Sequence, residues 1–132
     1  MVVDAVSKPL ELDRRELVPP TGPREFWYPA LLAKKVGRKP VKMRLLGEEL
    51  CFFRDEDGKV AALWDVCPHR GASLSAGNYH YRGTVSCPYH GWTFNGRGDC
   101  VAVLSEGPQS RISGKVQAKL YPTRELKGMV FV

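Results

Sequence analysis

Two short segments, each with one cysteine and one histidine, constrain this chain more than any other feature of its sequence. They read Cys67-Pro68-His69-Arg70-Gly71 and Cys87-Pro88-Tyr89-His90-Gly91-Trp92. A proline after each cysteine stiffens the loop, and a glycine near each histidine lets backbone N–H groups approach sulfur closely. Each segment directly follows a predicted strand, so the two loop tips can converge. Together they offer a site with four ligands, namely Cys67, His69, Cys87 and His90.

Two cysteines and two histidines suit either of two kinds of metal site. Tetrahedral zinc is the commonest structural occupant of such a set. Zinc fingers, however, group cysteine with cysteine and histidine with histidine, whereas each segment here supplies one of each. In a Rieske 2Fe-2S centre, two cysteines bind one iron and two histidines bind the other. The mixed segments therefore favour the dinuclear centre, and zinc stays open as the alternative.

The remaining sequence predicts a small all-β domain. A chain of 132 residues is the length of one domain, and 43% hydrophobic residues are enough to form a core. Short apolar runs separated by glycine-rich turns, including Asp57-Gly58, are typical of an antiparallel sandwich or barrel. The predicted strands are 41–46, 50–54, 60–65, 84–86, 92–95, 100–104, 116–121 and 129–132. Segment 25–36 is expected to form a short turn or helix, and the proline-rich residues 1–24 a flexible lead-in.

Charge and cysteine content bear on partners and location. The net charge is +6, and one basic run has no acidic residue in it: Lys34, Lys35, Arg38, Lys39, Lys42 and Arg44. This run is either a solvated face, a docking patch for an acidic protein, or a nucleic-acid site; no aromatic residue is interleaved to stack on bases, so we expect no nucleic acid. No apolar run is long enough to cross a bilayer, and no secretory signal is recognisable. We expect a cytoplasmic protein in which cysteines bind metal.

Residues 26–132 resemble the Rieske domain of ring-hydroxylating non-haem iron oxygenases. The strings CPHRGA and CPYHGW are similar to that family's motif pair almost letter for letter, and FWYPALLA and LKGMVFV resemble its flanking sequence. The resemblance implies a Rieske fold over residues 25–132, with antiparallel sheets and a small cluster-binding subdomain whose loops lie at about 66–95. It also implies that a Rieske 2Fe-2S cluster is ligated by Cys67, His69, Cys87 and His90.

The same resemblance implies electron-transfer partners. A flavin-dependent reductase or a ferredoxin would donate electrons, and an oxygenase catalytic domain with a mononuclear non-haem Fe(II) would accept them, in an enzyme that is commonly a trimer. After His69 and His90 are assigned, only His80 remains, so a two-histidine, one-carboxylate iron site cannot be built. We therefore expect the electron-relay domain of a longer aromatic-compound oxygenase, here truncated before its catalytic domain. A stand-alone Rieske ferredoxin is the alternative.

Positions around the motifs differ from those of respiratory Rieske proteins. In that class a disulfide joins the two cluster loops, and serine and tyrosine hydroxyls lie near the cluster. Ala72 and Tyr89 stand where the disulfide cysteines would be, and Trp92 and Phe94 stand where the hydroxyls would be. The resemblance therefore predicts a reduction potential at the low end of the Rieske range, roughly −150 mV.

Overall fold

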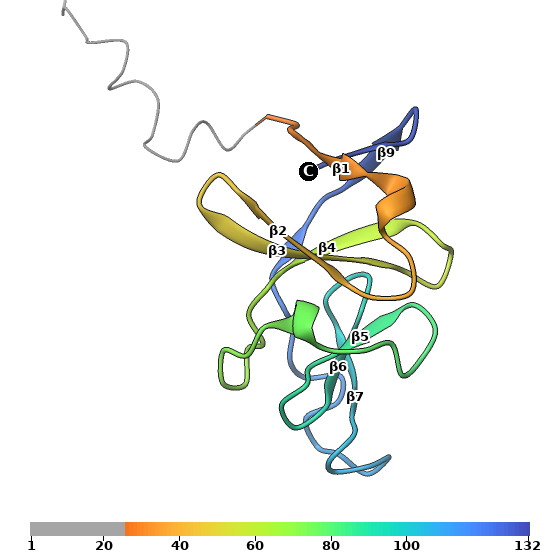
Figure 1. Cartoon of the computed structure of the whole chain (residues 1–132). Coiled ribbons are helices and arrows are strands. Elements are labelled where there is room, and N and C mark those ends of the chain that lie inside the picture. Colours follow the sequence, from red (N-terminus) through yellow and green to blue (C-terminus); the bar gives the residue numbers. More distant parts are fainter. Residues whose placement is uncertain (1–25) are drawn as a thin grey trace, which may run out of the picture.

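The computed structural model describes residues 26–132, which form three antiparallel sheets (Figure 1). The central sheet has the order β2 (Val41–Leu45), β3 (Glu48–Arg54), β4 (Val60–Trp64) and β8 (Leu120–Tyr121). A second sheet, above it in Figure 1, contains β1 (Pro29–Leu32), β10 (Met129–Phe131) and β9 (Arg124–Leu126). The third sheet, below it, contains β5 (Thr84–Ser86), β6 (Trp92–Asn95) and β7 (Cys100–Val103).

The all-β prediction is confirmed. Within residues 26–132 the helical segments are two 3₁₀ turns, η2 (Ala33–Lys35) and η3 (Leu74–Ala76). None of the helical segments in this range is long and apolar enough to cross a membrane. The predicted lead-in at 1–24 lies outside the described residues, and the domain boundary at residue 25 stays a prediction.

Turn chemistry explains how the central strands pair. Leu46 and Gly47 both have positive φ, 48° and 78°, which gives the tight two-residue turn between β2 and β3 the twist that antiparallel strands require. The β3–β4 turn is held by Asp55, whose carboxylate accepts the backbone N–H groups of Asp57 and Lys59 at 2.9 Å each. Gly58 has a φ of 79° there. The predicted turns at Gly47 and Asp57-Gly58 are therefore present.

Strand β3 separates two hydrophobic cores. Successive strand side chains point to opposite faces, so Cys51 and Phe53 enter one core while Leu50 and Phe52 enter the other. All four are buried. The core on the Cys51 side also contains both motif cysteines, and we call it the motif-side core. Burial of both faces is the reason why this strand reads as a continuous apolar run.

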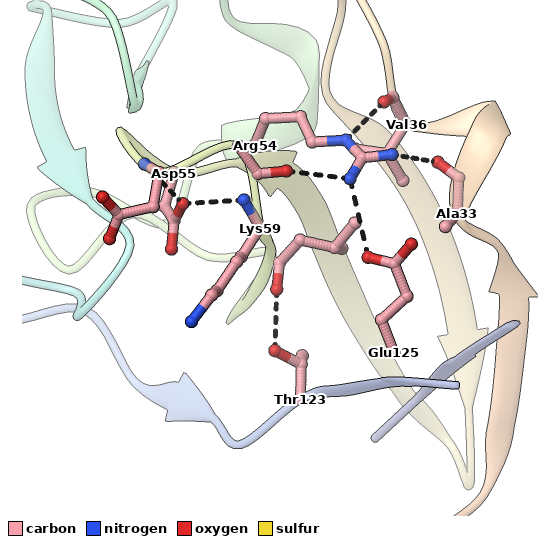
Figure 2. A network of polar contacts seen from close by, with 10 residues as sticks. Ala33, Val36, Arg54, Asp55, Lys59, Thr123 and Glu125 are labelled. Atoms are coloured by element: carbon pink, nitrogen blue, oxygen red, sulfur yellow. Dashed lines mark hydrogen bonds and ion pairs between the residues drawn. The ribbon is translucent and has the colours of Figure 1, made fainter. Parts of the chain in front are cut away.

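Arg54 links the second sheet (β1, β10 and β9) to the central sheet (Figure 2). Its guanidinium donates hydrogen bonds to the carbonyl oxygens of Val36 at 2.9 Å and Ala33 at 2.5 Å, and a third to Gly58 at 2.9 Å. The Glu125 carboxylate lies 3.7 Å from the same group. Because one rigid fork holds carbonyls from η2 and from the β3–β4 turn, Arg54 fixes how the two sheets meet.

The structure departs from the sequence prediction at three places. Segment 25–36, expected to be a turn or helix, contains strand β1 followed by η2; Pro29 is tolerated because it begins an edge strand. The predicted strand 116–121 is regular only at β8, because the chain leaves β7 and joins β4 within this segment. Strand β9 was not predicted, since all three of its residues are exposed and lack an apolar pattern.

Candidate metal centre

The first Cys–His segment forms a closed loop between β4 and η3, and we call residues 65–73 the first cluster loop. The Cys67 N–H donates to the Ala72 carbonyl at 2.8 Å, and the Gly71 N–H donates to the Cys67 carbonyl at 2.8 Å. Gly71 has a φ of 77°, a conformation that glycine adopts without strain. The chain therefore turns back on itself around His69.

The second segment closes the hairpin between β5 and β6, and we call residues 87–91 the second cluster loop. The Cys87 N–H donates to the Trp92 carbonyl at 2.8 Å. His90 and Gly91 both have positive φ, 70° and 71°. A Cβ at Gly91 would lie 2.6 Å from the Cβ of Leu104, so this position requires glycine. His90 in the left-handed region costs about 1–2 kcal/mol, a kind of backbone strain that clusters at functional sites.

The structure places the four predicted ligands in two pairs, one of thiols and one of imidazoles. Figure 1 shows the loop after β4 beside the loop between β5 and β6, and the imidazole rings of His69 and His90 lie 5.1 Å apart between centroids. Cys67 and Cys87 are both buried in the motif-side core, with their thiols within interaction distance. Sulfur thus faces sulfur on the buried side, and imidazole faces imidazole on the outer side.

Burial controls the chemistry of the first thiol. It raises the pKa of Cys67 to about 12, and the neighbouring Cys87 adds to the rise. The backbone N–H groups of His69 and Arg70 donate toward the Cys67 sulfur and oppose this rise. Without a cation the thiol therefore keeps its proton at neutral pH. A thiolate here needs the compensating charge of a metal, which deprotonates a coordinating thiol.

Each imidazole has an aromatic neighbour. The Trp92 indole stacks on His69 with a centroid separation of 4.4 Å and an interplanar angle of 10°. Tyr89 contacts His90 edge to face at 4.2 Å. Trp92 is buried, whereas Tyr89 and His90 are exposed. One face of the His69 imidazole is therefore covered, whereas His90 is exposed.

These donors fit a dinuclear cluster. His69 Nδ1 is buried and has no hydrogen-bond partner among the described residues, which is costly unless another group satisfies it. Between residues 26 and 132, no three or more His, Cys, Asp or Glu side chains are grouped to hold a single metal ion. What the chain presents is a thiol pair and an imidazole pair. That arrangement matches a centre with two cysteines on one iron and two histidines on the other.

Comparison with known proteins identifies the domain. Residues 26–120 match the family described as the Rieske 2Fe-2S domain. The chain belongs to this family. Proteins of the family carry a Rieske-type cluster, so the Rieske fold and the cofactor inferred from the sequence are both confirmed at the level of the family.

Relatives of this Rieske domain are oxygenase subunits. The chain is 40% identical over 111 residues to the oxygenase subunit of 3-chlorobenzoate-3,4-dioxygenase from Comamonas testosteroni, covering 83% of this chain and 26% of that protein. The terminal oxygenase of carbazole 1,9a-dioxygenase from a Novosphingobium species superposes with a TM-score of 0.75 at 42% identity, covering 84% of this chain and 30% of the other. A carbazole 1,9a-dioxygenase oxygenase in reduced complex with its ferredoxin gives a TM-score of 0.73 at 38% identity, covering 84% and 29%. The chain thus spans about a quarter of the length of the curated relatives it matches.

The other two cysteines, the third histidine and the basic run are not among the predicted ligands. Cys51 and Cys100 are fully buried free thiols that pack in the motif-side core, as small hydrophobic residues do. His80 lies exposed between η3 and β5. Lys42, in the basic run, is paired with Glu49 at 3.0 Å, so the run is not free of acidic neighbours in space.

Sequence reasoning missed the buried polar groups beneath the two loops. Ser86 and Thr93 hydrogen bond to each other at 2.7 Å between their hydroxyl oxygens, and Thr93 also donates to the Gly91 carbonyl at 3.1 Å. Asp65 is buried at the start of the first cluster loop. All three lie within two residues of a motif boundary. Polar residues at the ends of apolar strands were the available signal.

Proposed function

We propose that Cys67 and Cys87 hold one iron of a Rieske 2Fe-2S cluster, and that His69 and His90 hold the other. The observation that carries this assignment is the pairing of buried thiol with thiol and of imidazole with imidazole across the two loops. The unpartnered Nδ1 of His69 supports it. When bound, such a cluster accepts and returns one electron at a time.

The protein residues divide the site into a dry side and an open side. The cysteines lie in the motif-side core, where N–H groups of His69 and Arg70 point at the Cys67 sulfur. Trp92 covers the ring of His69 and keeps water from that face. His90 and Tyr89 are exposed, so the electron enters and leaves through this edge. The covered side holds the cluster, and the open side meets the partner.

The function we propose is one-electron relay within an aromatic-compound Rieske oxygenase. The support is that the named relatives are oxygenase subunits and that one solved relative is held in complex with a ferredoxin. A ferredoxin or a flavin-dependent reductase would donate the electron, and a catalytic domain with a mononuclear non-haem iron would accept it, in a trimeric enzyme of the cytoplasm.

Metal loading with matched control variants tests the ligand assignment. The protein is reconstituted anaerobically with iron and sulfide, and its absorption and redox titration are recorded. We expect one electron per chain for the wild type, and loss of the cluster in Cys67→Ser and His69→Asn. The control variants Cys100→Ser and His80→Asn keep it. Loss of the cluster in the control variants, with retention in the motif variants, would overturn the assignment.

A further inference from the structure

Asp65 is a buried carboxylate at the start of the first cluster loop. It directly follows β4, and its side chain has no exposed surface. Oδ2 accepts the hydroxyl protons of Ser73 at 2.8 Å and Ser75 at 2.7 Å, and Oδ1 accepts the backbone N–H of Ser75 at 2.6 Å. The Lys42 ammonium lies 3.7 Å from Oδ2. Both carboxylate oxygens therefore accept hydrogen bonds from the segment that begins η3.

These contacts join the two ends of the first cluster loop. The loop leaves β4 at Asp65 and returns to the core at Ser73, and η3 begins at the next residue. Cys67 and His69 lie inside the segment that is closed in this way. The backbone hydrogen bonds between Cys67 and Ala72 shape the loop internally, whereas the Asp65 contacts fix it against β4 and η3.

A buried carboxylate such as Asp65 is costly to the fold, so its presence calls for a physical explanation. Removing a charge from water costs several kcal/mol, and apolar residues of similar volume are often as stable at such positions. Here three hydrogen bonds hold the carboxylate, and the lysine beside it is itself 45% exposed. The geometry therefore favours a specific role for the charge over a simple gain in stability.

We propose that Asp65 is a positioning residue of the centre, whose carboxylate fixes Cys67 and His69 in place and holds the reduction potential of the cluster low. The inference rests on the proposed ligation. One residue separates Asp65 from Cys67, and a negative charge so near disfavours the added electron. The Asp65 carboxylate also acts on Cys51 in the motif-side core. Burial is the main cause of the raised pKa of Cys51, and the Asp65 carboxylate is the second cause.

Two substitutions separate the charge of Asp65 from its hydrogen bonds. Asp65→Asn removes the charge but keeps a hydrogen-bonding side chain. Its amide oxygen can accept the Ser75 N–H, and its NH2 group can donate to the two serine hydroxyls, which rotate to accept. Asp65→Ala removes every acceptor. Asp99→Asn and Asp99→Ala are the matched controls, because Asp99 lies near the β6–β7 turn, 35% exposed, with its own partners Gln117 at 2.6 Å and Arg97 at 3.6 Å.

The measurements are the midpoint potential, iron release to a chelator, and hydrogen exchange of the protein without metal. We expect Asp65→Asn to keep its cluster at a more positive potential than both wild type and Asp99→Asn. Asp65→Ala should release iron at least about tenfold faster than Asp99→Ala, as loss of an outer-shell partner does elsewhere. In the metal-free protein, Asp65→Ala should also lose exchange protection at the Ser75 amide.

The outcomes distinguish this inference from the function on which it rests. A wild type that binds no cluster contradicts the ligand assignment before any variant is compared, and it overturns this inference with it. A wild type with a normal cluster, together with an Asp65→Asn potential equal to that of Asp99→Asn, overturns the electrostatic role alone. Unchanged iron release and unchanged Ser75 exchange in Asp65→Ala overturn the positioning role.

Discussion

Adding a single methyl group at Gly77, by Gly77→Ala, should push the two cluster loops apart. It directly follows η3, and its backbone packs against Ser86, the residue before Cys87. A Cβ at Gly77 would lie 1.7 Å from the Ser86 carbonyl oxygen and 2.8 Å from its carbon, whereas nonbonded heavy atoms pack at about 3.5 Å or more. The obstacle is backbone, which no change of rotamer can move. Gly77→Ala must therefore push η3 away from β5.

The cost follows from the contacts that such a displacement breaks. The bridge between Asn78 and Ser86 has two backbone hydrogen bonds, Asn78 N–H to Ser86 carbonyl at 3.3 Å and Ser86 N–H to Asn78 carbonyl at 2.9 Å. Their loss costs about 1–3 kcal/mol, and overpacking a buried site adds about 1–3 kcal/mol. The free energy of unfolding should fall by roughly 2–6 kcal/mol, which lowers the melting temperature by roughly 10–25 °C in a domain of this size.

Thermal unfolding followed by circular dichroism measures this effect, with bound iron determined on the same samples. Gly37→Ala is the control, because nothing lies within 4 Å of its added Cβ and its φ is not in the left-handed region. We expect that control to melt at or slightly above the wild-type temperature, since alanine restricts the unfolded chain. A Gly77→Ala protein with the wild-type melting temperature and full iron content would refute the reasoning.

Three further predictions concern the Arg54 guanidinium, the Tyr79 phenol and the proposed ligand His90. Arg54→Met should lower the free energy of unfolding in urea by about 2–3 kcal/mol, because three carbonyls lose a charged donor; an unchanged urea midpoint would contradict this. Burial raises the pKa of Tyr79 to about 12, above its unfolded value near 10, so the phenol ionises more easily in the unfolded chain, and the stability that is fully present below pH 10 falls as pH rises toward 12. Tyr79→Phe should therefore be as stable as wild type at pH 7 and lose less stability by pH 11, and equal losses in urea titrations at both pH values would argue against it. His90→Cys should lower the midpoint potential, because a thiolate adds negative charge to the cluster, and an unchanged potential with the cluster intact would exclude that argument.

The sequence was sufficient where local chemistry decides the structure. Gly47 and Gly58 occur at turns that need positive φ, so both central hairpins could be placed. The two Cys–His segments placed both loops, because proline restricts the backbone after each cysteine and glycine permits the positive φ at Gly71 and Gly91. Cys51 follows the apolar Leu50 and precedes two phenylalanines, and all four side chains are buried.

The features that the sequence did not predict depend on contacts between distant segments of the chain. Strand β1 begins with Pro29 and is a strand only because β10, about 100 residues later, pairs with it. Asp65 lacks any local signal for the three hydrogen bonds it accepts, since these require η3 to fold back on β4. The switch of the chain from β7 to β4 after Val116 also depends on where both sheets lie. Propensity and pattern along the chain do not contain this information.

The most direct test of the account is the metal and sulfide content of the purified chain, combined with magnetic resonance of protein labelled with nitrogen-15 at histidine alone. We predict two irons and two sulfides per chain, and hyperfine coupling of the reduced cluster to nitrogens of two histidines. A colourless protein with one zinc per chain, or a cluster coupled to no histidine nitrogen, would contradict it.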